Sequence, residues 1–211
     1  MSKLQLNLAK PGDVAQKLSL NLNKGEGFKV RLSWDGDTDL DLHALVAVNT
    51  GAGAKVSAME DILSPYNVQR TIRGQTVGTL PKAPNGTFQV HGGALVHSPD
   101  ATDGNLSGDD EYVIVQPDRL TPPAGGAIEI PLVAMIHPQA SGRAFRNVQN
   151  ARVIIESAQG VELLNVSLSS QFGEFIGVQM GSILVDANGS SFAAIGVGFN
   201  QDFNEVLGHF S

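Results

Sequence analysis

The feature that most constrains the fold of this chain is a period-two alternation of apolar and polar residues that recurs along its length. Leucine occupies every second position in residues 4–8 and 18–22, and larger apolar side chains do so in residues 28–34. Side chains that alternate in this way lie on opposite faces of a β-strand, so each run predicts a strand with one buried face. The first two runs are near copies, but the period then stops, which indicates two similar strands and not a repeat array.

Further strands are predicted between turn signals. They span residues 42–48, 87–90, 112–115, 127–137, 151–157, 161–168, 181–186 and 192–199. The pair Asn188-Gly189 lies between two apolar runs and predicts a β-hairpin. Helical periodicity is limited to short turns at about residues 141–149 and 203–210. About ten short strands separated by Gly- and Pro-rich turns predict an all-β fold, a two-sheet β-sandwich with few short helical turns.

The length of the chain, 211 residues, fits one large domain or two small ones. We expect a single β-sandwich domain over residues 1–211, because a compact domain of this size buries roughly 70% of its unfolded surface and needs no staples. The sequence contains no cysteine, which excludes disulfides and thiolate metal sites. The polar, Gly- and Pro-rich stretch at about residues 70–93 indicates a loop or hairpin inserted into the sandwich.

The charge and hydropathy of the chain indicate which partners it can bind and in which cellular compartment it is expected. The first residues alternate polar and apolar side chains and do not resemble a signal peptide, and no stretch approaches the ~18 apolar residues of a membrane span. We therefore expect a soluble, cytoplasmic protein with no direct membrane insertion. The net charge of −7, from 21 acidic and 14 basic residues, argues against a nucleic-acid partner, because such binding needs a basic face.

One acidic segment, residues 100–111, carries much of the excess negative charge. Its five carboxylates, which alternate with Gly, Asn, Ser and Thr and include no Lys or Arg between them, belong to Asp100, Asp103, Asp109, Asp110 and Glu111. This composition favours turns over helix, and its hard oxygen ligands suit Ca²⁺. An ordinary exposed acidic turn is the alternative. Because the segment leads into a strand, Asp109 and Glu111 are expected to point to one side and Asp110 to the other.

A second acidic cluster places aspartate at every second position. Asp35, Asp37, Asp39 and Asp41 fall on one narrow face, where like charges repel each other. This repulsion favours metal binding, and a solvated strand face with a turn is the alternative. Neither cluster forms an EF-hand loop, because valine or isoleucine occupies the twelfth position, where Glu is needed.

These motifs resemble those of the TerD family of tellurium-resistance and stress-response proteins. Family members carry Trp-Asp, then Asp-Leu-Asp-Ala at the start of a strand, and later a His-Ser-Gly-Asp loop that ends in Gly-Asp-Asp-Glu. The residues that correspond to the first motif are Trp34, Asp35, Asp39, Leu40, Asp41 and Leu42. The second motif aligns without a gap, and its matching residues are His97, Ser98, Asp100, Gly104, Gly108, Asp109, Asp110 and Glu111. The segment 136–151 and the run at 192–199 also look like family segments, so the resemblance covers about residues 18–199.

The resemblance implies a two-sheet sandwich that binds Ca²⁺, in two or more sites, through acidic loops at one end. The metal-site residues that it implies are Asp39, Asp41, Asn67, Asp100, Gly104, Asp109, Asp110 and Glu111. Asn67 enters this set because residues 61–67 look like an Asp-Phe-Val-Phe-Tyr-Asn run of the family. Pro99, Asn105 and Leu106 depart from the family pattern, and the smaller number of carboxylates predicts a weaker calcium affinity.

The function that this resemblance implies is non-enzymatic. The expected protein binds calcium, belongs to a tellurium-resistance or stress-response system, and acts through calcium-ordered loops and protein partners. An alternative is a structural or assembly module, phage-associated, that forms homo-oligomers stapled by calcium. A metal-dependent hydrolase is a third class, but the sequence contains no Gly-x-Ser-x-Gly elbow, Walker loop or His-x-x-x-His pair.

Overall fold

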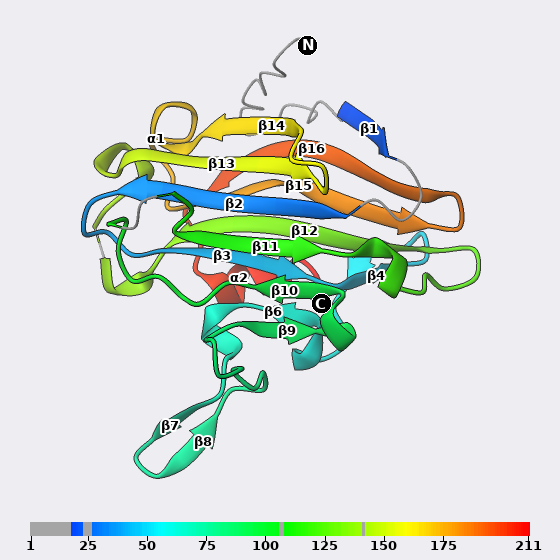
Figure 1. Cartoon of the computed structure of the whole chain (residues 1–211), viewed down its shortest axis with the longest axis horizontal. Coiled ribbons are helices and arrows are strands. Elements are labelled where there is room, and N and C mark those ends of the chain that lie inside the picture. Colours follow the sequence, from blue (N-terminus) through cyan, green and yellow to red (C-terminus); the bar gives the residue numbers. More distant parts are fainter. Residues whose placement is uncertain (1–17, 23–26, 106–107, 141) are drawn as a thin grey trace.

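Two antiparallel β-sheets stack face to face in the computed structural model, which describes residues 18–22, 27–105, 108–140 and 142–211 (Figure 1). The larger sheet has the order β1 (Leu18–Leu22), β16 (Gly189–Phe199), β15 (Gly177–Asp186), β12 (Ala127–Ile136), β3 (Leu40–Leu45), β6 (Ile62–Leu63), with β4 (Ala47–Asn49) on β12 and β5 (Ala54–Lys55) on β4. The smaller sheet has the order β14 (Glu162–Ser167), β13 (Gln149–Ser157), β2 (Phe28–Asp35), β11 (Glu111–Val115), β10 (Leu95–His97), β9 (Phe88–Val90). This architecture confirms the predicted all-β sandwich.

The strands predicted within the described residues are present, within a few residues at their ends, but the strand predicted at residues 42–48 is divided at Val46 into β3 and β4. The predicted hairpin near Asn188 is present as β15 and β16, but Asp186 pairs with Gly189, so its loop begins one residue earlier than expected. The sequence pattern did not predict β10, β6 or the short α1 (Leu168–Gln171). The alternating run at residues 4–8 lies outside the described residues.

The core lies between the two sheets and follows from the alternation in β2. Phe28, Val30, Leu32 and Trp34 are each at most 2% exposed, and they pack against apolar side chains of β3, β12 and β15 in one continuous cluster. Each fully buried side chain of this size contributes about 1.5–3 kcal/mol by leaving water. The same alternation that predicts the strand therefore supplies the main favourable contribution to stacking the sheets.

A second apolar layer covers the outer face of the larger sheet. Helix α2 (Phe203–Gly208) places Phe203 and Val206 against Leu45, Val133 and Met135. Phe203 also stacks on His43, and every residue of β3 is buried, including its polar side chains. The helix begins with a capping box, in which the side chain of the residue before it and a glutamate in its first turn bond to each other's backbone N–H groups.

Short 3₁₀ turns and one projecting hairpin complete the described structure. The turns are η1 (Met59–Asp61), η2 (Pro65–Asn67), η3 (His91–Gly93), η4 (Pro117–Arg119), η5 (Pro138–Ala140) and η6 (Phe145–Asn147). Within the segment predicted to hold an inserted loop or hairpin, β7 (Arg70–Ile72) and β8 (Gln75–Val77) form a two-stranded hairpin that extends below the sandwich in Figure 1. None of the helices among the described residues has the length and apolar character needed to cross a membrane.

Candidate metal centre

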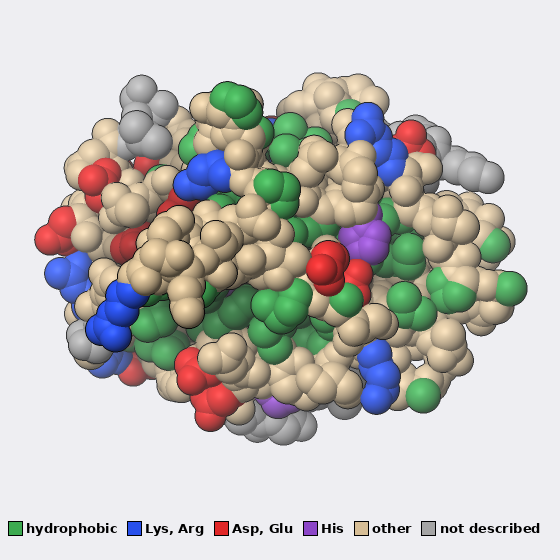
Figure 2. Space-filling model, turned by 90° about the horizontal axis from the view of Figure 1, so that it is seen from below, with side chains coloured by type: hydrophobic (Ala, Val, Ile, Leu, Met, Phe, Trp, Pro, Cys, Tyr) green, Lys and Arg blue, Asp and Glu red, His purple; other side chains and the backbone are tan. Residues whose placement is uncertain are grey.

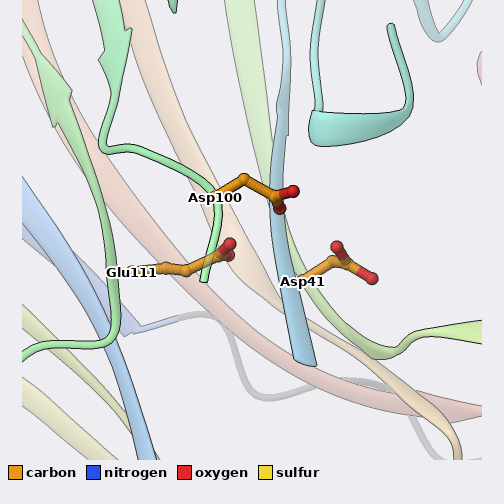
Figure 3. A group of neighbouring side chains, drawn as sticks. All are labelled: Asp41, Asp100 and Glu111. Atoms are coloured by element: carbon orange, nitrogen blue, oxygen red, sulfur yellow. The ribbon is translucent and has the colours of Figure 1, made fainter. Parts of the chain in front are cut away.

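Three carboxylates converge at the end of the sandwich where β3 and β11 begin. Asp41 comes from β3, Asp100 from the loop after β10, and Glu111 from the first position of β11 (Figure 3). One oxygen from each lies within 4.8 Å of the others. Asp41 is 1% exposed and Glu111 is fully buried, whereas Asp100 is exposed. The cluster therefore joins both sheets and one acidic loop, with a single side open to solvent.

Unpaired backbone groups of β3 explain why Glu111 points inward. Strand β6 pairs with β3 only at Ala44 and Leu45, so the N–H and C=O of the buried Leu42 need other partners. The Leu42 N–H donates to Glu111 Oε2 at 2.7 Å, and His97 Nε2 lies 2.9 Å from the Leu42 carbonyl oxygen. Two polar side chains of the smaller sheet thus take over the role of a neighbouring strand and bring Glu111 beside Asp41.

The buried carboxylates of the cluster resist ionisation. Burial is the main reason that the pKa of Asp41 lies well above its usual range; a 2.5 Å hydrogen bond from the Tyr66 hydroxyl opposes the rise, and the charges of Asp39 and Asp100 add to it. Burial also raises the pKa of Glu111, and the charges of Asp41 and Asp100 reinforce that effect. Without a cation these groups cannot all be charged at low energetic cost, which is the situation that a bound metal ion relieves.

Tyr66 is a residue of this site that the sequence analysis did not single out. It lies in η2, and its ring makes edge contacts with His43, His137 and Phe203. Burial and the neighbouring charge of Asp41 raise the pKa of Tyr66, so it remains a hydrogen-bond donor. Its only local signal is its place next to Asn67 in the 61–67 run.

Asp39 lies at the margin of the cluster. Its Oδ1 is buried and has no hydrogen-bond partner among the described residues, while its Oδ2 is 3.7 Å from His137 Nδ1. Burial raises the pKa of Asp39, with a lowering contribution from His137 and further increases from the charges of Asp100 and Asp103. An unpartnered buried carboxylate oxygen beside three other carboxylates is an additional oxygen available to a cation.

Asp109 and Asp110 make other contacts. Asp109 is 2.8 Å from Lys29 and also pairs with Arg31; burial acts to raise its pKa, but the hydrogen bonds from these two cations hold the pKa below the usual value. Asp110 is buried and accepts a hydrogen bond from the backbone N–H of Trp34 at 2.9 Å. The prediction that Asp109 and Glu111 point to the same side is wrong, because β11 begins only at Glu111: Asp109 pairs with cations of β2, whereas Glu111 bonds to β3 of the larger sheet.

Asn67 is buried and holds the turns that precede the hairpin. Its Nδ2 donates to the carbonyl oxygens of Met59 and Ile62 at 2.7 and 3.0 Å. Its Oδ1 accepts a hydrogen bond from the Thr79 backbone N–H at 3.2 Å. The amide group of Asn67 is thus engaged with the chain around it.

Gly104 positions the acidic loop against the core. Its N–H donates to the Gly36 carbonyl oxygen at 2.8 Å. A Cβ at this position would lie 2.7 Å from Trp34 Nε1 and closer still to the Trp34 carbonyl oxygen. Gly104 is therefore required for the close approach of the loop to Trp34.

The donor set defines what the centre can bind. Asp41, Asp100 and Glu111 offer carboxylate oxygens, with Asp39 beside them, and these are the ligands that hard cations prefer. His97, whose Nε2 lies 3.8 Å from Glu111 Oε2, is fully buried, and both of its ring nitrogens face backbone carbonyl oxygens. The residues present therefore fit a hard cation such as Ca²⁺.

Comparisons with known proteins agree with this architecture. The sequence pattern of the TerD domain matches residues 85–210, more than half of the chain, and no curated protein matches the sequence. A crystal structure of a homologue of the telluride resistance protein TerD from Streptomyces coelicolor superposes with a TM-score of 0.64 at 17% identity, over 86% of this chain and 95% of that chain. A protein of unknown function gives a TM-score of 0.63 at 18% identity, over 87% and 96%. The chain belongs to the TerD domain family.

Proposed function

We propose that this protein is a non-enzymatic calcium-binding protein that acts in a tellurium-resistance or stress-response system through protein partners. The observation that carries the proposal is the convergence of Asp41, Asp100 and Glu111 within 4.8 Å. Family membership and the fold shared with the Streptomyces coelicolor homologue of the telluride resistance protein support the tellurium-resistance context.

The choice of calcium rests on the shape and composition of the centre. Ca²⁺ accepts six to eight oxygen ligands in flexible geometry, whereas Mg²⁺ demands a tighter octahedron and keeps several waters. Asp41 and Glu111 are fixed by strands, while Asp100 lies on a loop that can adjust. When bound, the ion supplies the positive charge that this group of carboxylates lacks.

Binding of one ion by Asp100 and Glu111 would order the acidic loop. Asp100 is exposed, and its side chain forms no hydrogen bond or ion pair with the described residues, whereas Glu111 is fixed to β3. Ligation of both by one ion ties the loop to the rigid strand, and the ordered loop is then available as a binding surface. The direct test for this step is calcium-dependent capture of partner proteins on immobilised full-length chain, compared with capture in a chelator.

Asp100→Asn tests the ligand assignment by isothermal titration calorimetry. We expect calcium to bind the wild type more tightly than Mg²⁺, and the variant to lose roughly tenfold or more in calcium affinity, because affinity follows the number of ligand charges. Asp118→Asn, at an exposed position in η4, is the control for the same change in net charge. No calcium binding to the wild type would overturn the proposal, and equal affinities of wild type and Asp100→Asn would overturn this ligand set.

A further inference from the structure

The β7–β8 hairpin contributes no residue to the three-carboxylate cluster of the metal centre. It precedes the region matched by the TerD domain pattern, and residues 70–76 are all exposed. Its strands pair from Arg70 with Val77 to Ile72 with Gln75, which leaves a two-residue loop. A hairpin that buries almost nothing in its own molecule gains little stability from being there.

The tip of the hairpin carries residues that suit contact more than local folding. Arg73 and Gly74 have φ angles of 51° and 80°, the positive values of a type I′ turn, for which Asn-Gly is the preferred pair. A non-glycine residue with positive φ is uncommon, and the turn itself does not favour a long side chain such as that of Arg73 at this position. Ile72, directly before the turn, is 46% exposed. An exposed apolar residue and a strained arginine together indicate a surface that meets a partner.

The charge of this segment is opposite to that of the whole chain. Residues 62–99 contain Arg70, Arg73 and Lys82 and no acidic residue, although the net charge of the chain is −7. Among the described residues, none of these three cations forms an ion pair. Arg70 donates a hydrogen bond to the Tyr66 carbonyl oxygen at 3.1 Å, so the hairpin is a basic element with no acidic partner within the described part of the molecule.

A groove with the complementary character lies beside helix α2. This α2 groove has a volume of about 330 Å³, and its apolar lining includes Ile62, Tyr66, Phe203 and Leu207. Asp202 also lines it, and the carboxylate of Glu205 lies next to Asp202 because the two residues form the capping box. None of residues 70–77 lines the groove. Figure 2, viewed from the side on which the hairpin projects, shows both apolar and acidic side chains on that side of the molecule.

We propose that the β7–β8 hairpin of one molecule inserts into the α2 groove of a second copy, in a reciprocal twofold dimer. Tyr66 lines the groove and precedes the hairpin by only a few residues, so the hairpin and the groove belong to neighbouring parts of the surface. A twofold axis then allows both insertions at once and closes the assembly. Ile72 enters the apolar part of the groove, and Arg70 and Arg73 approach Asp202 and Glu205.

Sedimentation velocity of the full chain in a chelator tests this proposal separately from calcium binding. The wild type is expected to show a monomer–dimer equilibrium that shifts toward monomer as salt screens the charges. Arg73→Glu should weaken dimerisation roughly tenfold or more, because like charges then face each other. Arg152→Glu, which makes the same charge change at an exposed position of β13 in the smaller sheet, should leave the equilibrium unchanged.

A charge swap identifies the two surfaces. Asn204 is exposed and lines the groove, so Asn204→Arg places a cation there without altering the helix cap. Each variant alone, Arg73→Glu or Asn204→Arg, should dimerise weakly. An equimolar mixture should dimerise again, because both hairpin–groove contacts of the mixed dimer then pair opposite charges.

Three results would overturn the proposal. A wild type that stays monomeric over the whole concentration range removes the dimer. A dimer that survives Arg73→Glu places the interface elsewhere. Two weakly dimerising variants that do not recover when mixed show that the hairpin and the groove do not meet.

Discussion

Asp41→Asn separates the electrostatic repulsion among the clustered carboxylates from the role of Asp41 in ligation. Asp41 is 1% exposed, and its carboxylate lies within 4.8 Å of those of Asp100 and Glu111. At an effective dielectric constant of about 20, two ionised groups at that distance repel by about 3 kcal/mol. Protonation already relieves part of this repulsion, because the pKa values of Asp41 and Glu111 are raised. We therefore expect the variant, in a chelator at neutral pH, to be about 1–2 kcal/mol more stable than the wild type.

The assay is thermal unfolding followed by circular dichroism, in a chelator and in excess calcium. For a domain of this size the expected gain in the chelator is a rise in melting temperature of about 2–8 °C. In calcium the order should reverse, because ligand at about 100 times its Kd stabilises the wild type by ~2.7 kcal/mol and the variant lacks one ligand charge. The asparagine retains an oxygen for the Tyr66 hydroxyl, so this contact is preserved.

Asp118→Asn is the control for charge removal at an exposed position, and neither its stability in chelator nor its response to calcium should differ from the wild type. An Asp41→Asn variant that is less stable than the wild type in chelator would refute the repulsion argument. A variant that keeps the full calcium response would show that Asp41 is not a ligand.

Three further outcomes follow from the same contacts. Asp109→Asn loses two ion pairs with β2 and should lower the free energy of unfolding, measured in urea, by about 1 kcal/mol. Its calcium affinity, measured by calorimetry, should be unchanged within about twofold. An affinity loss as large as that of Asp41→Asn would make Asp109 a ligand. The folded-state pKa values of Asp41 and Glu111 are raised above 3.8 and 4.5, so these groups stabilise the ion-free fold at low pH and lose that contribution as pH rises. The calcium-induced rise in melting temperature should therefore be smaller at about pH 5.5 than at about pH 7.5. A rise that is independent of pH would contradict this prediction. Gly104→Ala forces a Cβ against Trp34, so it should lower the free energy of unfolding by about 1–3 kcal/mol and shift the fluorescence of the single tryptophan. An unchanged spectrum and an unchanged stability would show that the loop does not pack against Trp34.

The strands with long alternating patterns were predictable from sequence, and those shaped by distant parts of the chain were not. In β2 each second residue is apolar and buried, so the pattern is sufficient. In β10 only three residues pair, and the last, His97, is polar yet buried, so no alternation reveals it. In β3 the alternating polar residues Asp41 and His43 should face solvent, but the Tyr66 hydroxyl bonds to Asp41, and Phe203 of helix α2, near the other end of the sequence, stacks on His43. The sequence around β3 does not predict contacts with such distant residues.

The site was predictable in its chemistry and only partly in its membership. The acidic composition indicates oxygen ligands, and three of the expected residues, Asp41, Asp100 and Glu111, do converge. Which carboxylates converge depends on where β11 begins and on which cations lie nearby. Asp109 lies next to Lys29, a residue eighty positions away in the sequence, and this pairing could not be inferred from the spacing of acidic residues.

The side-chain bridge from the smaller sheet to Leu42 has a consequence for how long the folded chain survives. Glu111 and His97 fasten β3 at a point where β6 no longer pairs with it, so shearing one sheet past the other must first break these two bonds. An ion held by Asp41 and Glu111 would add a third connection across the same seam and would slow its opening. Since proteases act on chains that have opened, at rates set by how often and how fast they open, the ambient calcium level would then set the lifetime of the protein as well as its shape.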